Sequence, residues 1–265
     1  AVCSHGHTVF HQPENGLTLQ IGNLPKIADY IEQTVVCDFR VQDVALGGQG
    51  APLVPIGDAL LFPEYDFCLN LGGFANISFQ NNDQRVAFDI CPANITLNHY
   101  IKNLGFSYDK DGSLASQGKL SLPLLESLNQ LAFYQKQPPK SLGLEWLQSE
   151  VYPLIDSFHL DIDSILRTLV EHTATQIVSV LNHHHLKQGL YTGGGALNSF
   201  LMSRIEALLE QKIPRANESL IHFKEALIFA FLGVLKLRNE VNCLRSVTGA
   251  SKDHSSGKIY FPHMD

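Results

Sequence analysis

The sequence predicts an α/β protein, because short apolar strands and longer amphipathic helices alternate along its 265 residues. Residues 67–71 form an apolar run that ends at a glycine pair, which is typical of a buried strand. Residues 164–182 carry apolar side chains at helical spacing along one stripe, which predicts a long packed helix. The third observation is the order strand, glycine triplet, helix within residues 189–211.

The first elements of the chain are short. Residues 17–21 alternate apolar and polar side chains, which predicts a half-buried strand. We expect a helix over residues 24–33, since Asn23 can cap it and a proline occupies its first turn. A buried strand is expected at residues 35–39, and a glycine-rich loop at residues 47–50.

The later elements form a meander of two hairpins and then mostly helices. The sequence predicts strands at residues 67–71, 76–79, 86–90 and 189–191, and helices at residues 94–103, 123–134, 164–182 and 198–211.

Composition excludes several classes of function. The chain is 45% apolar and 17% charged, and its net charge of −7 argues against binding to nucleic acid or to an acidic membrane. Its five cysteines include no CxxC pair, so neither a disulfide framework nor a structural zinc site is expected. The most apolar stretch, residues 226–235, is about half as long as a membrane span. With no signal peptide visible, we expect a cytoplasmic protein.

Two glycine clusters follow predicted strands, in the segments LNLGGFAN (69–76) and YTGGGALN (191–198). Neither matches the P-loop or the dinucleotide fingerprint. Two interpretations of each cluster stay open. Such glycines often form only a tight turn, but they also let backbone N–H groups approach a ligand closely.

Several longer segments are more distinctive than the glycine clusters. They are SHGHTVFH (4–11), LQIGN (19–23), DFRVQDVALGGQGAPLVP (38–55), LNLGGFANISF (69–79), YDKDG (108–112), PPKSLGLEW (138–146), GGGALNSFLMSRI (193–205), EALIFAFL (225–232) and VTGA (247–250). In this order, they make the chain similar to the anhydro-N-acetylmuramic acid kinase family of the actin-like sugar kinase superfamily.

The resemblance implies a two-lobed, ribonuclease H-like fold, with a remnant of the first lobe at residues 1–50, a second lobe at 51–238, and a segment returning toward the first lobe at 239–265. It implies an enzyme that uses ATP and Mg²⁺, opens the 1,6-anhydro bridge of the muramic amino sugar with water, and phosphorylates the freed O6. The glycine clusters then bind the nucleotide, through the residues Gly72, Gly73, Asn76, Gly193, Gly194, Gly195 and Asn198.

Asp89 matches the family's catalytic base, although from position alone it reads as a strand-end aspartate that starts a turn. Three glycines of the family's motif are replaced here by Ala87, Cys91 and Ala93. If the backbone at these positions needs positive φ, the side chains of Ala87, Cys91 and Ala93 would disfavour that conformation. Glu225 matches a sugar-facing glutamate, but an acidic residue in the first turn of a helix is also expected as a dipole partner.

His5 and Thr8 match the family's sugar-side HGQT segment, with histidine in place of its glutamine at position 7. Arg40 and Asp43 match its FRxxD segment. Arg40 either binds an anionic group of the substrate or forms a surface ion pair. Asp43 either helps to hold Mg²⁺ or pairs with Arg40.

The family's N-terminal phosphate-binding hairpin has no counterpart in the sequence, so the first lobe is expected to be incomplete and this chain alone to show little kinase turnover. The alternative is a non-catalytic actin-like protein that binds a nucleotide or a partner. We also expect an exposed apolar patch beside residues 1–40, which leaves room for a homodimer.

One distance and one arrangement would test the site. Asp89 and Glu225 should lie within about 10 Å of each other, the spacing of carboxylates around a pyranose. The turns at Gly72–Gly73 and Gly193–Gly195 should line one cleft from opposite sides, open to solvent.

Overall fold

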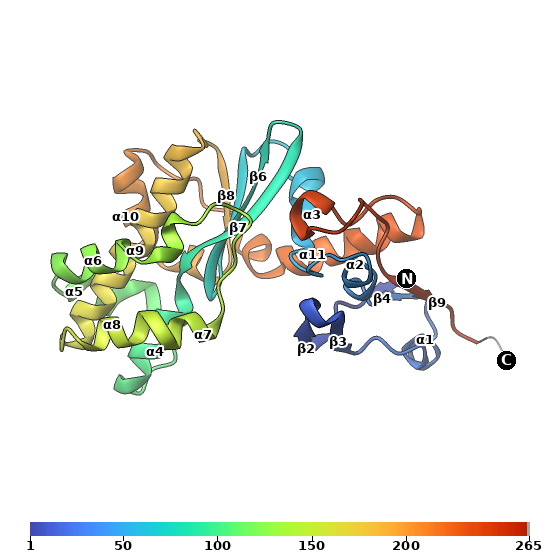
Figure 1. The fold of residues 1–265 in the computed structure, drawn as a ribbon, viewed down its shortest axis with the longest axis horizontal. Coiled ribbons are helices and arrows are strands. Elements are labelled where there is room, and N and C mark those ends of the chain that lie inside the picture. The colour runs from blue at the N-terminus through green and yellow to red at the C-terminus, as the bar shows by residue number, and fades with distance from the viewer. Residues whose placement is uncertain (264–265) are drawn as a thin grey trace. The chain divides into compact units, whose positions relative to one another are not determined.

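The computed structural model describes residues 1–263 and confirms the α/β class (Figure 1). The chain divides into two compact units. Unit 1 comprises residues 1–64, 79–87 and 223–265, and unit 2 comprises residues 65–78 and 88–222. The helices α3 (Val54–Leu61) and α11 (Glu218–Leu237), the latter from Phe223 onward, belong to unit 1. The lobe boundaries at residues 50 and 238 stay a prediction.

Unit 1 contains two small sheets and several helices. Its elements are β1 (Val2–Cys3), β2 (His7–Gln12), β3 (Leu17–Ile21), α1 (Lys26–Ile31), β4 (Val35–Cys37), α2 (Val41–Ala45), α3 (Val54–Leu61), most of α11 (Glu218–Leu237), α12 (Arg245–Thr248) and β9 (Lys258–Tyr260).

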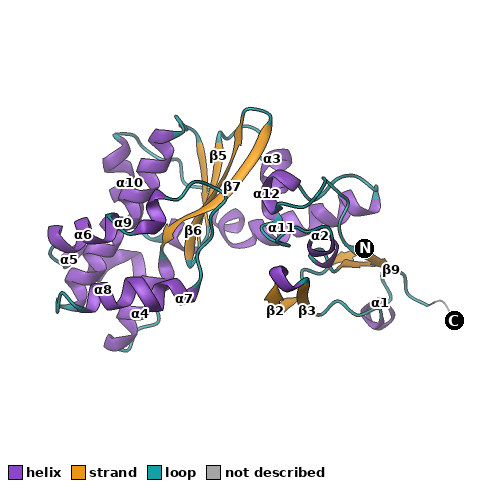
Figure 2. Ribbon diagram, viewed as in Figure 1, coloured by secondary structure: helices purple, strands orange, loops and turns teal. Residues whose placement is uncertain are grey.

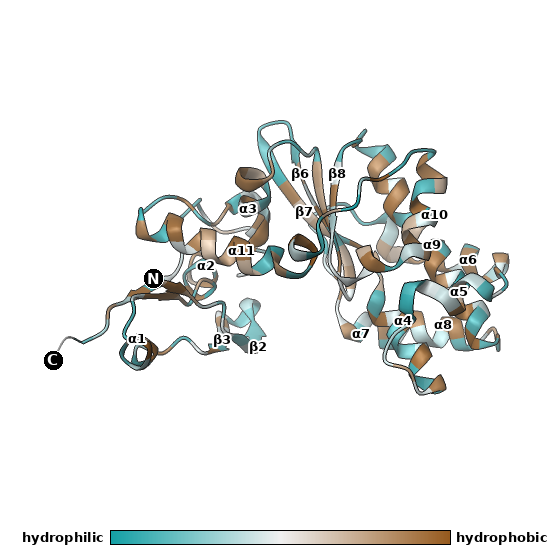
Figure 3. Ribbon diagram, turned by 180° about the vertical axis from the view of Figure 1, so that it is seen from behind, coloured by the Kyte–Doolittle hydropathy of each residue, from teal (hydrophilic) through white to brown (hydrophobic). Residues whose placement is uncertain are grey.

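The three-stranded sheet of unit 1 joins the two ends of the chain. β4 lies in its centre, with β1 parallel on one side and β9 antiparallel on the other. These strands are coloured as hydrophobic in Figure 3. One side of the sheet packs on α11, where Val36 joins Phe39, Ile228, Phe229 and Leu232 in one buried cluster. The residues after position 238 therefore complete the first unit.

Unit 2 is built around a four-stranded sheet and a long helix (Figure 2). Its elements are β5 (Phe67–Leu71), β6 (Phe74–Asn81), β7 (Gln84–Pro92), α4 (Asn94–Ile101), α5 (Ser113–Gln117), α6 (Leu122–Asn129), α7 (Leu144–Trp146), α8 (Tyr152–Asp156), α9 (Ile162–His183), β8 (Gly189–Thr192) and α10 (Ser199–Leu209). Residues 79–87, which form the end of β6, the turn and the start of β7, belong to unit 1.

The strand order in this sheet is β7-β6-β5-β8, and β5 and β8 pair in parallel. The predicted meander is confirmed, since two-residue turns join β5 to β6 and β6 to β7. The predicted stripe on α9 is buried from Ile165 to Leu181, where the helix contacts α4, α5, α6 and α10. The apolar stripe therefore forms the core on which the other helices of unit 2 pack.

Two expected helices differ from prediction at their ends. The helix expected over residues 24–33 covers only Lys26–Ile31, because Glu32 turns into the left-handed region and ends it. Its N-cap position is Pro25 and has no side-chain hydrogen bond, so Asn23 does not cap it. The helix expected to start near Glu225 begins at Glu218.

Large apolar side chains are exposed among residues 1–40, as the sequence predicts. Examples are Val9, Ile21, Leu24 and Tyr30, whose relative exposures are 56%, 56%, 69% and 79%. Association through these side chains stays a prediction. Among residues 1–263, we find no helix whose length and apolar character would allow it to cross a bilayer.

Candidate functional site

The two glycine turns of unit 2 lie side by side. Each follows one of two adjacent parallel strands, and the last paired residues, Asn70 of β5 and Thr192 of β8, stand opposite each other. The carboxyl ends of parallel strands meet at one edge of a sheet, where α/β proteins commonly bind ligands. Gly73 and Gly194 are exposed at this edge. Both turns are therefore open to solvent, on neighbouring strands of one unit. They are neighbours at one sheet edge, so the prediction that they lie on opposite sides of a cleft is wrong.

The packing between the two turns requires glycine at one position. Gly193 has a φ of +80°, and a Cβ there would lie 2.6 Å from Oδ1 of Asn70. Asn94, the first residue of α4, holds the first turn through two hydrogen bonds. Its Nδ2 donates to the Leu71 carbonyl at 3.0 Å, and its backbone N–H donates to the Gly72 carbonyl at 3.2 Å. The edge is therefore a rigid backbone surface.

Two helices begin at this edge. α4 starts at Asn94, directly after the hydrogen bonds to the first turn, and α10 starts at Ser199, shortly after the glycine triplet. Helix N-termini present free N–H groups and a partial positive charge, which favour anions. Asn198 caps α10 by accepting a hydrogen bond from the Leu201 N–H at 3.0 Å. Its side-chain oxygen is thus already engaged, while Asn76 lies half-buried on β6.

Asp89 lies near the end of β7, half-buried and held by a loop of the same unit. Its Oδ2 accepts a hydrogen bond from the Leu142 N–H at 2.8 Å, and its own N–H donates to the Lys140 carbonyl at 3.1 Å. Burial raises the pKa of the Asp89 carboxyl, and the Leu142 N–H partly opposes that rise. A carboxyl with a raised pKa is suited to exchanging a proton near neutral pH.

The substitutions around Asp89 place no side chain in the left-handed region of backbone conformation. Ala87, Cys91 and Ala93 all have negative φ, so the left-handed conformation that would need glycine does not occur at these positions. Cys91 and Ala93 are fully buried. The substitutions therefore differ from glycine mainly in the side-chain volume that they add near Asp89.

Unit 1 brings His5 and Arg40 together. Nη2 of Arg40 lies 2.7 Å from Nε2 of His5, and Nη1 donates to the Gly50 carbonyl at 2.7 Å. Nδ1 of His5 lies 2.8 Å from the Gly6 carbonyl, which can only accept, so Nδ1 carries the proton and Nε2 accepts from Arg40. Burial, and then the charge of Arg40, lower the pKa of His5. Arg40 forms this network and no carboxylate pair with Asp43.

Glu225 is exposed on α11 and faces the same surroundings. Its negative charge raises the pKa values of His5 and Arg40, against the larger lowering by burial. It lies seven residues after the start of α11 at Glu218, so the interpretation of Glu225 as a first-turn dipole partner is wrong. Thr8 is exposed on β2, where its hydroxyl accepts a hydrogen bond from Gln20 at 3.3 Å.

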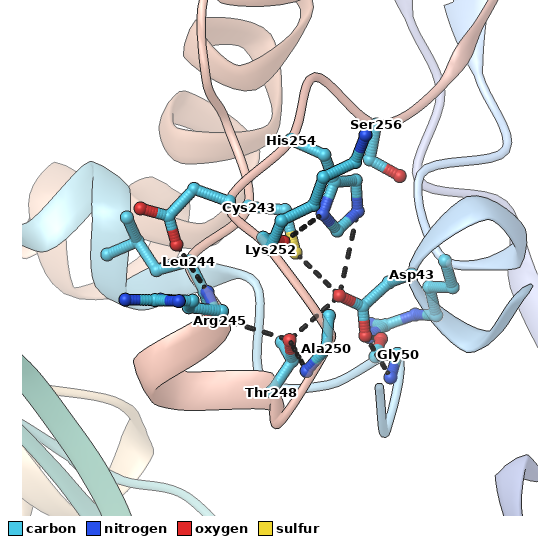
Figure 4. Close-up of polar contacts among 12 residues, drawn as sticks. Asp43, Gly50, Cys243, Leu244, Arg245, Thr248, Ala250, Lys252, His254 and Ser256 are labelled. Carbon is cyan, nitrogen blue, oxygen red and sulfur yellow. Dashed lines mark hydrogen bonds and ion pairs between the residues drawn. The ribbon is translucent and has the colours of Figure 1, made fainter. Parts of the chain in front are cut away.

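Asp43 lies at the centre of a closed polar cluster (Figure 4). Its side chain is completely buried. Its Oδ1 accepts hydrogen bonds from the Thr248 hydroxyl at 2.7 Å and the Cys243 thiol at 3.0 Å, and its Oδ2 accepts one from the Gly50 N–H at 2.7 Å. Mg²⁺ prefers six oxygen ligands, several of them waters. A buried carboxylate beside a thiol does not fit that ion, and the arrangement gives the predicted Mg²⁺ role no support.

The predicted residues thus form separate groups within their own units. In unit 2, the glycine turns share one edge; in unit 1, His5, Arg40 and Glu225 share one electrostatic environment. Sequence reasoning missed Asn94, although it ends the segment that matches the family's aspartate motif. The predicted distance between Asp89 and Glu225 concerns residues of different units and stays a prediction.

Comparison with known proteins gives one consistent result. A sequence profile of the family described as "Anhydro-N-acetylmuramic acid kinase" matches residues 1–262. A protein of that name from Vibrio cholerae serotype O1 is 38% identical over 280 residues, covering 99% of this chain and 75% of the relative. Another, from Pseudomonas syringae pv. syringae, is 37% identical over 275 residues, covering 98% and 75%.

Solved structures are more distant. The activator of the 2-hydroxyisocaproyl-CoA dehydratase from Clostridium difficile, with bound ADPNP, is 15% identical and covers 77% of this chain and 70% of that chain. Its TM-score against this chain is 0.44.

Proposed function

The chain belongs to the anhydro-N-acetylmuramic acid kinase family, and on that premise we propose that it binds ATP and the anhydro-muramic sugar and transfers the γ-phosphoryl group to O6. The observation that carries the proposal is the family match over residues 1–262. The contacts within each unit support the roles of individual residues in this reaction.

Asp89 is proposed as the general base. Water attacks C1 of the sugar and gives its proton to the Asp89 carboxylate, the C1–O6 bond breaks, and O6 takes the γ-phosphoryl group as ADP leaves. The raised pKa of Asp89 supports this role, because a base whose pKa is nearer to neutrality is better able to accept a proton. The hydrogen bond from the Leu142 N–H positions the carboxylate.

The turns at Gly72–Gly73 and Gly193–Gly195 are proposed to bind the nucleotide. Exposed backbone at the carboxyl edge of two parallel strands lets phosphate oxygens approach closely, and the first turns of α4 and α10 add partial positive charge. Gly194 supports this assignment, since a Cβ there would have only Asn94 Nδ2 nearby, at 3.8 Å. No residue is assigned to Mg²⁺, which would neutralise charge on the phosphates.

Arg40 is proposed to bind the lactyl carboxylate of the sugar, with Glu225 and Thr8 contacting its hydroxyl groups. Arg40 is held by His5 and by the Gly50 carbonyl, so its guanidinium is positioned before substrate arrives. A charge-assisted bond from a positioned arginine discriminates strongly for an anionic ligand. His5 supports Arg40 by accepting one of its hydrogen bonds.

The second candidate is a binding protein without catalysis. The observation that favours it is the replacement of the family's glycines by Ala87, Cys91 and Ala93, whose side chains narrow the space beside Asp89. Turnover separates the two candidates, because a binding protein would retain ligand affinity without forming a phosphosugar.

The test is to incubate the protein with ATP, Mg²⁺ and the anhydro-sugar and to detect the phosphosugar by mass spectrometry, with calorimetry for the binding of each ligand. Asp89→Asn should lower kcat by a factor of about 100 to 10,000. Asp66→Asn is the matched control, since Asp66 also accepts backbone N–H bonds in unit 2 and has no proposed role. Binding of both ligands without product would favour the binding protein. An absence of sugar binding would contradict both the kinase and its proposed substrate.

A further inference from the structure

The cluster around Asp43 also contains a buried histidine whose second ring nitrogen has no partner. Nδ1 of His254 lies 3.1 Å from the Lys252 carbonyl. A carbonyl only accepts, so Nδ1 carries the proton and the neutral ring has a bare lone pair on Nε2. This Nε2 is buried without a hydrogen-bond partner and lies 3.6 Å from Oδ1 of Asp43. Two electron-rich atoms therefore face each other away from water.

A second proton on His254 would give an ion pair with Asp43, but 3.6 Å is too long for a hydrogen bond, so Nε2 would still lack one. A metal ion between the two atoms would bond directly to both. Ligand atoms that bind zinc at about 2.0 to 2.3 Å in a tetrahedron lie about 3.3 to 3.7 Å apart. One ligand atom each from Asp43, Cys243 and His254 lies within 4.8 Å of the other two.

The backbone holds these donors in place. Cys243 and His254 form an antiparallel bridge, in which each N–H donates to the other's carbonyl at 3.1 Å. Asp43 comes from α2, two hundred residues earlier in the chain. The side chains of Cys243, His254 and Asp43 point toward one another in Figure 4. The ligand set is therefore ordered by two independent parts of unit 1.

We propose that Asp43, Cys243 and His254 bind a zinc ion, with the fourth position taken by water. Thiolate, imidazole and carboxylate together favour zinc over the hard cations Mg²⁺ and Ca²⁺. Binding replaces the Cys243 thiol proton, which leaves to solvent as the Zn–S bond forms. The ion joins α2 to the C-terminal segment, and it fixes the loop whose Gly50 carbonyl holds Arg40.

The test begins with the purified full chain, without a histidine tag. Elemental analysis by mass spectrometry should find about one zinc per molecule. Replacement by Co²⁺ should give the visible bands of a tetrahedral site and a thiolate charge-transfer band in the near ultraviolet. Folded protein that neither retains zinc nor binds added Zn²⁺ or Co²⁺ would overturn the proposal.

Variants then identify the ligands. Cys243→Ser should remove the charge-transfer band. Cys243→Ser and His254→Gln should each weaken zinc binding by a factor of more than about 100, which exceeds the effect of losing an outer-shell partner. Cys37→Ser is the matched control, since Cys37 is also buried in unit 1 but lies outside the cluster. Unchanged metal binding in the Cys243 variant would overturn the proposal. If that variant does not fold, the charge-transfer band of the Cys37→Ser protein decides, because its loss would assign the thiolate to Cys37.

Discussion

Arg40 donates a hydrogen bond to Nε2 of His5 at 2.7 Å, although 35 residues separate the two. The bond requires that Nε2 of His5 be unprotonated, which the Nδ1 contact with the Gly6 carbonyl ensures. The histidine is thus part of the support of the arginine. In the proposed function, this pairing holds the permanent cation of Arg40 in place for the carboxylate of the sugar.

Arg40→Lys should weaken substrate binding more than turnover. A lysine cannot reproduce the planar fork that reaches both His5 and the Gly50 carbonyl. We expect KM for the sugar to rise by a factor of about 10 or more, and stability to fall by about 1 to 2 kcal/mol as two hydrogen bonds are lost. Steady-state kinetics and urea unfolding measure these. Arg238→Lys, at an exposed ion pair, is the control and should change neither.

The pH dependence of activity should report the surroundings of Asp89. Its pKa is raised by burial, so the carboxyl takes up its proton, and activity falls, at a higher pH than for an ordinary aspartate. Leu142→Pro removes the backbone N–H that opposes this rise. The acidic limb of kcat/KM should therefore move to still higher pH in this variant.

Leu142→Ala is the matched control for that experiment, because it removes the side chain but keeps the N–H. Its acidic limb should coincide with that of the unchanged protein. Equal shifts in the two variants would show that the side chain of Leu142, and not its N–H, affects the base.

Local patterns predicted much of unit 2. β5 and α9 follow directly from apolar periodicity, which depends only on neighbouring residues. The early start of α11 was missed, although Asn217 accepts a hydrogen bond from the Ser219 N–H and is a recognisable cap.

The long-range contacts could not be predicted in the same way. Asp43 was matched to a motif, but its partner Cys243 lies two hundred residues away, and no local spacing relates them. The absence of a CxxC pair indicated no zinc site, because that rule concerns ligands close in sequence. Only the fold brings Asp43, Cys243 and His254 together.

The two adjacent glycines of the triplet should respond differently to alanine. Gly193→Ala places a Cβ where φ is +80° and Asn70 is 2.6 Å away, so it should destabilise the fold by more than about 1 kcal/mol. Gly194→Ala meets only ordinary contact at 3.8 Å. It should leave thermal unfolding almost unchanged while raising KM for ATP. A stable Gly194→Ala protein with normal ATP kinetics would contradict nucleotide binding at this turn.

His172 should make unit 2 sensitive to acid. It is buried on α9, where Nδ1 donates to Oδ1 of Asn129 and Nε2 accepts from the Tyr134 hydroxyl at 2.7 Å. Burial lowers the pKa of His172 to about 3. The unfolded chain takes up this proton below pH 6.5, and the folded chain only near pH 3. Stability should therefore be full above pH 6.5 and fall below it by at most about 1.4 kcal/mol per pH unit.

Urea unfolding at pH 7 and pH 5 measures this loss, followed by the fluorescence of Trp146. This is the only tryptophan of the chain, and its ring lies 6.4 Å from that of Tyr134. His172→Gln should be less stable at pH 7, because the buried hydrogen bonds to Asn129 and Tyr134 are disturbed. It should, however, lose less stability than the unchanged protein between pH 7 and pH 5. His183→Gln, an exposed position on the same helix, should keep the full pH dependence. An unchanged pH dependence in His172→Gln would assign the acid sensitivity to other groups.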